Sequence, residues 1–158
     1  MVIGVGNLLL KDEGVGIHVA QELKKKPLPS QVKVLDGGVA GMGLLDFFPE
    51  ACKVLLIDAV DMNLQPGAVV RFTPEEVRAR AGDLRFSLHD IGLLEVLELA
   101  KVLHQRPPEV VIIGIQPKEI SWGMELTLEV QAAVAKAVEA VWEEIYQAGL
   151  RNGHPNEH

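Results

Sequence analysis

The segment KVLLIDAV, residues 53–60, decides the fold class of this 158-residue chain. Apart from its aspartate it is apolar on both alternating faces, and so is VVIIGI at residues 110–115. Short runs rich in Val and Ile favour strands, and strands that are apolar on both faces are covered by helices on both sides. Shorter apolar runs predict three further strands, at residues 2–5, 32–35 and 68–72.

Apolar residues at helical spacing fill the segments between these runs. They predict helices over residues 13–25, 42–48, 74–80, 90–104 and 124–147. This alternation predicts an α/β fold, a three-layer α/β/α sandwich with a mostly parallel, five-stranded sheet. The connection through Pro66-Gly67 is too short for a helical crossover, so we expect the strand at 68–72 to be antiparallel, at or near an edge.

The length predicts a single domain over residues 1–150, followed by a flexible polar tail at 151–158. The chain carries 15 basic and 22 acidic residues, which argues against non-specific binding to nucleic acid. No apolar run approaches the ~18 residues of a membrane span, and no secretory signal is visible. The single cysteine, Cys52, excludes an internal disulfide and suits a reducing compartment. We therefore expect a cytoplasmic protein that binds neither nucleic acid nor membrane.

Four candidate functional residues lie beside the ends of predicted strands, because ligands of open α/β sheets bind at the carboxyl ends of the strands. They are Glu13, Asp36, Asp58 and His89. Asp58 is the most informative, since a carboxylate within a buried apolar strand needs a partner or a ligand. Glu13, Asp58 and His89 come from three segments at one edge of the sheet. Two carboxylates and an imidazole suit a divalent ion such as zinc or nickel.

These segments also have competing interpretations. Glu13 near a helix start gains from the helix dipole without any catalytic role, and Asp12 is expected to cap that helix. Gly4-Val5-Gly6 follows a strand as a dinucleotide-binding loop would, but Leu9 stands where the third glycine is needed. Nucleotide binding is therefore the weaker alternative. Cys52 lies before the predicted strand at residues 53–60, at the amino end of that strand and away from the predicted cleft. It is not expected to be a nucleophile.

Five segments, in this order and with this spacing, resemble the nickel–iron hydrogenase maturation endopeptidases over nearly the whole chain. They are GVGNLLLKDEGVG (4–16), LDGGVAG (35–41), LLIDAV (55–60), SLHDIG (87–92) and IGIQP (113–117). The resemblance implies a monomeric α/β/α endopeptidase. Such an enzyme removes a C-terminal extension from the hydrogenase large-subunit precursor after nickel insertion. The resemblance also implies that Glu13, Asp58 and His89 bind the metal.

The same resemblance suggests how cleavage waits for nickel. The precursor holds the nickel, and Glu13, Asp58 and His89 recognise it there. We expect that zinc or cadmium can also occupy the same site. Cleavage then follows from a metal-polarised carbonyl or activated water, or from Asp58 or Glu13 acting as a general base. Asp36 is the candidate for an acid that positions the substrate or a ligand. The alternative from another class is a non-catalytic, metal-sensing chaperone that binds the precursor without cutting it.

Overall fold

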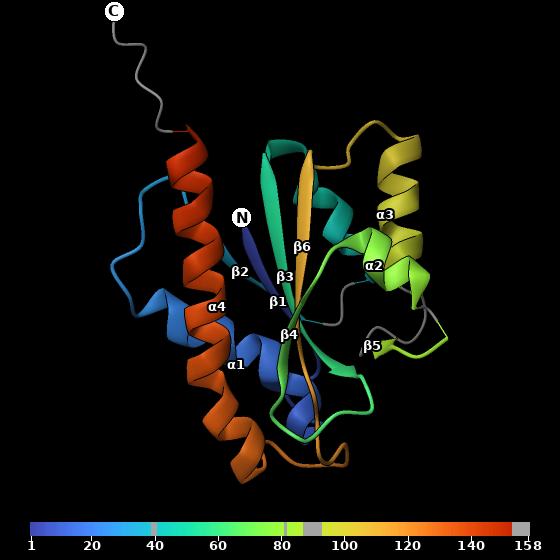
Figure 1. The fold of residues 1–158 in the computed structure, drawn as a ribbon, viewed down its shortest axis with the longest axis vertical. Coiled ribbons are helices and arrows are strands. Elements are labelled where there is room, and N and C mark those ends of the chain that lie inside the picture. Colours follow the sequence, from blue (N-terminus) through green and yellow to red (C-terminus); the bar gives the residue numbers. More distant parts are fainter. Residues whose placement is uncertain (39–40, 81, 87–92, 153–158) are drawn as a thin grey trace, which may run out of the picture.

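The computed structural model describes residues 1–38, 41–80, 82–86 and 93–152, which form a mixed sheet between two layers of helices (Figure 1). The strand order is β2-β1-β3-β6-β4. All neighbours are parallel except β4, which runs antiparallel to β6 at one edge. The predicted fold, including the antiparallel strand near residues 68–72, is confirmed. The strands are β1 (Val2–Val5), β2 (Val34–Gly38), β3 (Lys53–Asp61), β4 (Val69–Phe72) and β6 (Glu109–Ile115).

The helices follow the predicted order, with shifted ends. The α-helices are α1 (Val15–Lys24), α2 (Pro74–Ala79), α3 (Leu93–Val102) and α4 (Leu128–Asn152). The Thr73 side chain caps α2 by accepting a hydrogen bond from the backbone N–H of Glu76 at 3.3 Å. The predicted helix at 42–48 is instead a pair of short 3₁₀ helices, η2 (Gly41–Asp46) and η3 (Phe48–Glu50). A third, η1 (Lys11–Gly14), precedes α1.

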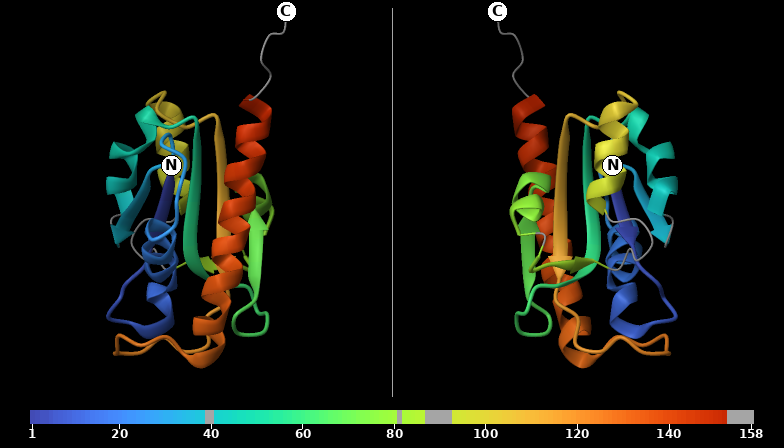
Figure 2. Two further views of the ribbon diagram at one scale, coloured as in Figure 1. Left: turned by 90° about the vertical axis from the view of Figure 1, so that its left-hand side faces the viewer. Right: turned by 90° about the vertical axis from the view of Figure 1, so that its right-hand side faces the viewer.

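The sheet separates two apolar cores, and alternate residues of each strand enter opposite cores. In β3, Leu55 and Ile57 pack with α1 and α4, whereas Leu56 and Val60 pack with α2, α3 and the 3₁₀ helices η2 and η3. Figure 1 shows α1 and α4 on one side of the sheet and α2 and α3 on the other. Figure 2 shows α4 running along the strand direction over most of the height of the sheet. The three layers follow from strands that are apolar on both faces.

Two further details differ from the prediction. A sixth, two-residue strand, β5 (Arg85–Phe86), pairs antiparallel with the end of β3. Helix α4 begins four residues later than predicted and extends to Asn152, so the first two residues of the predicted tail are helical. Within the described part of the chain, no helix is long and apolar enough to cross a membrane.

Candidate functional site

Asp58 lies near the carboxyl end of β3 and is only 1% exposed. It pairs with Gly114 of β6, and its neighbour Ile57 pairs with Gly4 of β1, so β3 lies between these two strands at this level. Leu56 and Val60, two residues to either side, belong to the core under α2 and α3. Because side chains alternate along a strand, Asp58 projects to that same face.

Glu13 is likewise 1% exposed, and close backbone packing places it at the same edge of the sheet. It lies in η1, on the connection that leads from β1 to α1. A Cβ atom on Gly6 would overlap the Glu13 carbonyl oxygen, and one on Gly16 would overlap the carbonyl oxygen of Ile57. Glycine therefore lets η1 and the start of α1 lie directly against the ends of β1 and β3. The structure brings Glu13, on η1, and Asp58, on β3, to the same edge of the sheet, as the sequence predicted.

The other two candidates are placed differently. Asp36 is exposed on the edge strand β2, and its carboxylate accepts a 2.8 Å hydrogen bond from the Gly38 backbone N–H. It pairs with Gly4, which pairs with Ile57, so it lies on the face of the sheet opposite to Asp58. His89 lies outside the described residues. Within the described residues no group of three His, Cys, Asp or Glu side chains could hold a metal ion.

Asp12, next to Glu13, has a role that the sequence did not reveal. It is fully buried, and neither η1 nor α1 has a side-chain cap, so the predicted capping role is wrong. Its carboxylate accepts hydrogen bonds of 2.8–2.9 Å from the backbone N–H groups of Lys118, Glu119 and Thr127 and from the Thr127 hydroxyl. Asp12 therefore fixes the loop that follows β6 to the segment that carries Glu13. These partners are more than a hundred residues away in the sequence, so no local pattern marks them.

Gln116, which directly follows β6, has a similar fixing role. It is buried, and its side-chain oxygen accepts hydrogen bonds from the backbone N–H groups of Met62 and Leu64, at 2.7 and 3.2 Å. Its amide nitrogen donates to the Asp61 carboxylate at 3.2 Å. This hydrogen bond, together with one from the Asn63 backbone N–H, holds the pKa of Asp61 below its ordinary value. Gln116 thus orders the chain just beyond the end of β3.

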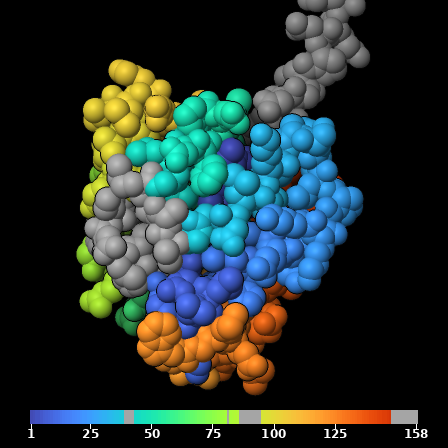
Figure 3. All heavy atoms as spheres, turned by 180° about the vertical axis from the view of Figure 1, so that it is seen from behind, coloured from blue at the N-terminus to red at the C-terminus, as the bar shows by residue number. Residues whose placement is uncertain are grey.

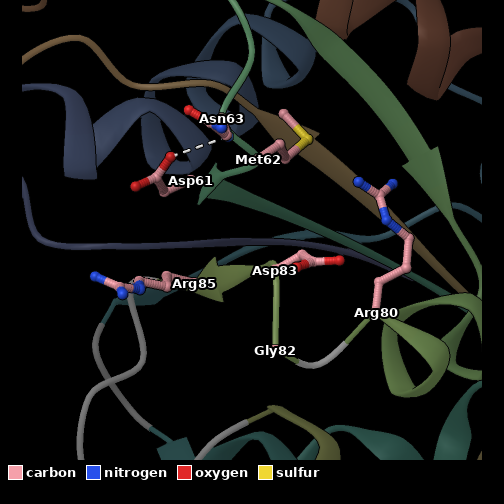
Figure 4. A pocket seen from close by; sticks show the side chains of 7 residues that line it. All are labelled: Asp61, Met62, Asn63, Arg80, Gly82, Asp83 and Arg85. Carbon is pink, nitrogen blue, oxygen red and sulfur yellow. Dashed lines mark hydrogen bonds between the residues drawn. The ribbon is translucent and has the colours of Figure 1, made fainter.

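A polar pocket of about 520 Å³ opens next to this chain segment (Figure 4). It begins three residues after Asp58, and the side chains around it carry both signs of charge. The Arg80 guanidinium lies 5.7 Å from the centre of the Phe72 ring, which fixes one wall of the pocket by a cation–π contact. The pocket is a second feature at this edge, beside the buried carboxylates. Its lining residues are Asp61, Met62, Asn63, Arg80, Gly82, Asp83 and Arg85.

Comparison with known proteins gives consistent matches over almost the entire chain. The family model HycI, hydrogenase maturation protease, matches residues 17–144. Hydrogenase expression/formation protein HupD of Bradyrhizobium diazoefficiens is 33% identical over 152 residues, 95% of this chain and 79% of that protein. The hydrogenase 2 maturation protease of Escherichia coli is 32% identical over 95% of this chain and 92% of its own. The solved structure of the hydrogenase maturating endopeptidase HybD from E. coli superimposes with a TM-score of 0.84 at 32% identity, covering 94% and 92% of the two chains.

Proposed function

The chain belongs to the hydrogenase maturation protease family and is a peptidase, and we propose that it cleaves the precursor of a nickel–iron hydrogenase large subunit. The reaction removes a C-terminal extension after nickel has been inserted. The observation that supports this proposal is the pair of buried carboxylates at one edge of the sheet, Glu13 on η1 and Asp58 near the carboxyl end of β3. Family membership favours this peptidase over the non-catalytic chaperone and the nucleotide-binding protein.

The donor chemistry of this site fits a divalent ion. Carboxylate oxygens bind such ions, and two buried acids at one edge favour a positive charge near them. In this proposal Glu13, Asp58 and His89 contact nickel that the precursor itself presents, so nickel arrives as part of the substrate. Other divalent ions, such as zinc or cadmium, would fit the same donors. An unloaded precursor lacks the positive charge and binds less well.

Peptide hydrolysis needs a water activated for attack and a stabilised carbonyl oxygen. A buried carboxylate can supply the first of these by accepting the proton of the water as a general base. Asp58 and Glu13 are the residues that could do so, and the nickel would polarise a nearby carbonyl. Asp36 lies on the face of the sheet opposite to Asp58. We propose that it positions the extended precursor segment rather than binding the metal.

A processing assay tests the proposal. Wild-type protein is mixed with the nickel-loaded and the nickel-free precursor, and cleavage is read as a mobility shift on a gel. We expect cleavage of the loaded precursor only, and its loss in Asp58→Asn and Glu13→Gln. Glu22→Gln, an exposed acid on α1, serves as the matched control and should cleave like wild type. Cleavage of both precursors would remove nickel as the checkpoint, and undiminished cleavage by Asp58→Asn would refute the assigned role.

The monomeric state and the cytoplasmic location of the protein stay predictions.

A further inference from the structure

The loop between β6 and α4 exposes large apolar side chains beside the candidate site. Nine large apolar residues are exposed in the described part of the chain, and five of them lie close together. Three are on this loop, one is the first residue of α4, and one is on the segment that is hydrogen-bonded to the loop. Their side chains are 51–86% exposed. We call these five residues the apolar surface: Leu9, Ile120, Trp122, Met124 and Leu128. Exposed apolar groups gathered in one place on a soluble fold mark interaction sites.

The backbone that carries the apolar surface is held by many hydrogen bonds. Gly123 forms a bridge with Leu10, donates its N–H to the Leu9 carbonyl at 2.9 Å and accepts one from the Lys11 N–H at 2.8 Å. The Asp12 carboxylate holds both ends of the loop. An ordered backbone presents its side chains to a partner at a low entropic cost. The hydrogen bonds therefore fix the backbone positions from which the exposed side chains extend.

The apolar surface is continuous with the candidate catalytic site. Lys11 and Asp12, which bind the loop, directly precede Glu13 in the sequence. Figure 3 shows the loop, in orange, lying against the blue N-terminal segment on one face of the molecule. A protein bound to the apolar surface would therefore lie beside the segment that carries Glu13.

The charges around the apolar surface are paired within the chain. Lys11 contacts Glu119 at 2.9 Å, and Lys118 contacts Glu129 at 2.7 Å. These side chains give a polar rim, while the apolar groups between them have no cover among the described residues. A polar rim around an apolar centre that contains a tryptophan is the usual composition of a protein–protein contact.

We propose that the apolar surface is the docking site for the folded body of the large-subunit precursor, and that its partner surface is correspondingly apolar. This inference rests on the proposed function, since the occupant is the substrate of that reaction. Docking holds the precursor so that its C-terminal segment reaches Glu13 and Asp58. The apolar surface therefore sets affinity for the precursor and takes no part in the chemical step.

Steady-state cleavage of the nickel-loaded precursor tests this inference. In the double variant Trp122→Ala/Leu128→Ala we expect KM to rise at least tenfold with kcat unchanged, because a truncated tryptophan at a contact centre costs at least that much binding. The matched control is Val102→Ala/Leu103→Ala, which truncates two apolar residues, 72% and 48% exposed, at the far end of α3. The control should keep the wild-type KM. Equal urea midpoints for all three proteins show that folding is intact.

Two results would overturn the inference. One is a KM of the double variant within threefold of wild type. The other is a wild-type dimer that Trp122→Ala/Leu128→Ala converts to monomers in sedimentation velocity, which assigns the surface to a second copy of this chain. If wild type leaves the loaded precursor uncut, the proposed function fails on its own. Sedimentation then still tests docking, because wild type and control should bind the precursor and the double variant should not.

Discussion

Replacing Asp12 tests the most heavily bonded side chain beside the candidate site. In Asp12→Ala the backbone N–H groups of Lys118, Glu119 and Thr127 and the Thr127 hydroxyl lose their common acceptor. A hydrogen bond to a charged group contributes about 1.5–3 kcal/mol, but four bonds to one carboxylate are not additive, and water reaches a surface loop once it opens. We therefore expect the free energy of unfolding to fall by about 3–4 kcal/mol.

Asp12→Asn separates the hydrogen bonds from the size of the side chain. One carboxylate oxygen, Oδ2, accepts from Lys118, Glu119 and the Thr127 hydroxyl, and the other, Oδ1, accepts from the Thr127 N–H. An asparagine with its carbonyl oxygen in the place of Oδ2 keeps three hydrogen bonds. Its NH₂ group then takes the place of Oδ1 and faces the Thr127 N–H, which loses its acceptor. We expect the loss to be about 2 kcal/mol, about half that of the alanine variant.

Urea unfolding measures both variants. With an m-value of about 2 kcal/mol/M, the alanine variant should unfold at about 1.5–2 M lower urea than wild type, without a change in m. Native-state amide exchange should be faster at Lys118 and Glu119, whose N–H groups the carboxylate binds in the wild type. Glu22→Gln is the exposed control and should leave the midpoint in place. A loss below about 1 kcal/mol in Asp12→Ala, with unchanged exchange at both amides, would refute the assigned role.

Three further variants probe the scaffold. Gly16→Ala places a Cβ atom on backbone carbonyl oxygens of β1 and β3 and should lower the free energy of unfolding by about 3 kcal/mol, measured by thermal unfolding. Gly82→Ala, with open space at its Cβ position, is the control and should leave the free energy of unfolding almost unchanged. Equal effects of the two substitutions would refute the packing argument. Gln116→Leu removes the acceptor of two backbone N–H groups and should cost about 2 kcal/mol in urea; a stabilised variant would contradict this. Burial raises the pKa of Glu144, but hydrogen bonds from Arg71 and Lys53 outweigh it and hold the pKa below its ordinary value of 4.5. Its contribution to stability is therefore present above pH 4.5 and lost as the pH falls through the lowered pKa. The free energies of unfolding of wild type and Glu144→Gln should therefore become equal in acid. A difference between them that stays constant with pH would exclude this ion pair as the cause.

The sheet was predictable because its strands carry a local signal. The runs at β3 and β6 are apolar on both faces, and only a strand covered on both sides buries every one of those residues. The antiparallel direction of β4 followed from a connection too short for a crossover. Both inferences use short-range information, and both are confirmed.

The errors arise where contacts distant in the sequence decide the outcome. Leu126 continues the apolar pattern of α4 and packs against the same core, but it lies two residues before the helix begins. Just before the helix begins, the Thr127 N–H donates to the Asp12 carboxylate, a contact that the local apolar pattern does not reveal. Likewise β5 is two residues long, and only its pairing with the end of β3 makes it a strand.

The candidate site divides in the same way. Strand ends are readable from the sequence, so Glu13 and Asp58 were expected at one edge and are found there, both buried. Asp36 was expected nearby, but its register with Gly4 puts it on the other face of the sheet. Register depends on pairing between strands, which the sequence of one strand does not reveal.

The way in which Asp12 holds its loop also bears on how such a protein can change its partner. Three of its four hydrogen bonds go to backbone N–H groups, which every residue except proline provides. The side chains at positions 120, 122 and 124 take no part in this attachment, so they can be exchanged while the loop stays in place. If the apolar surface is the proposed docking site, exchanging the side chains at 120, 122 and 124 for those of a relative would redirect the enzyme to another precursor, with Gly123, Glu13 and Asp58 left untouched.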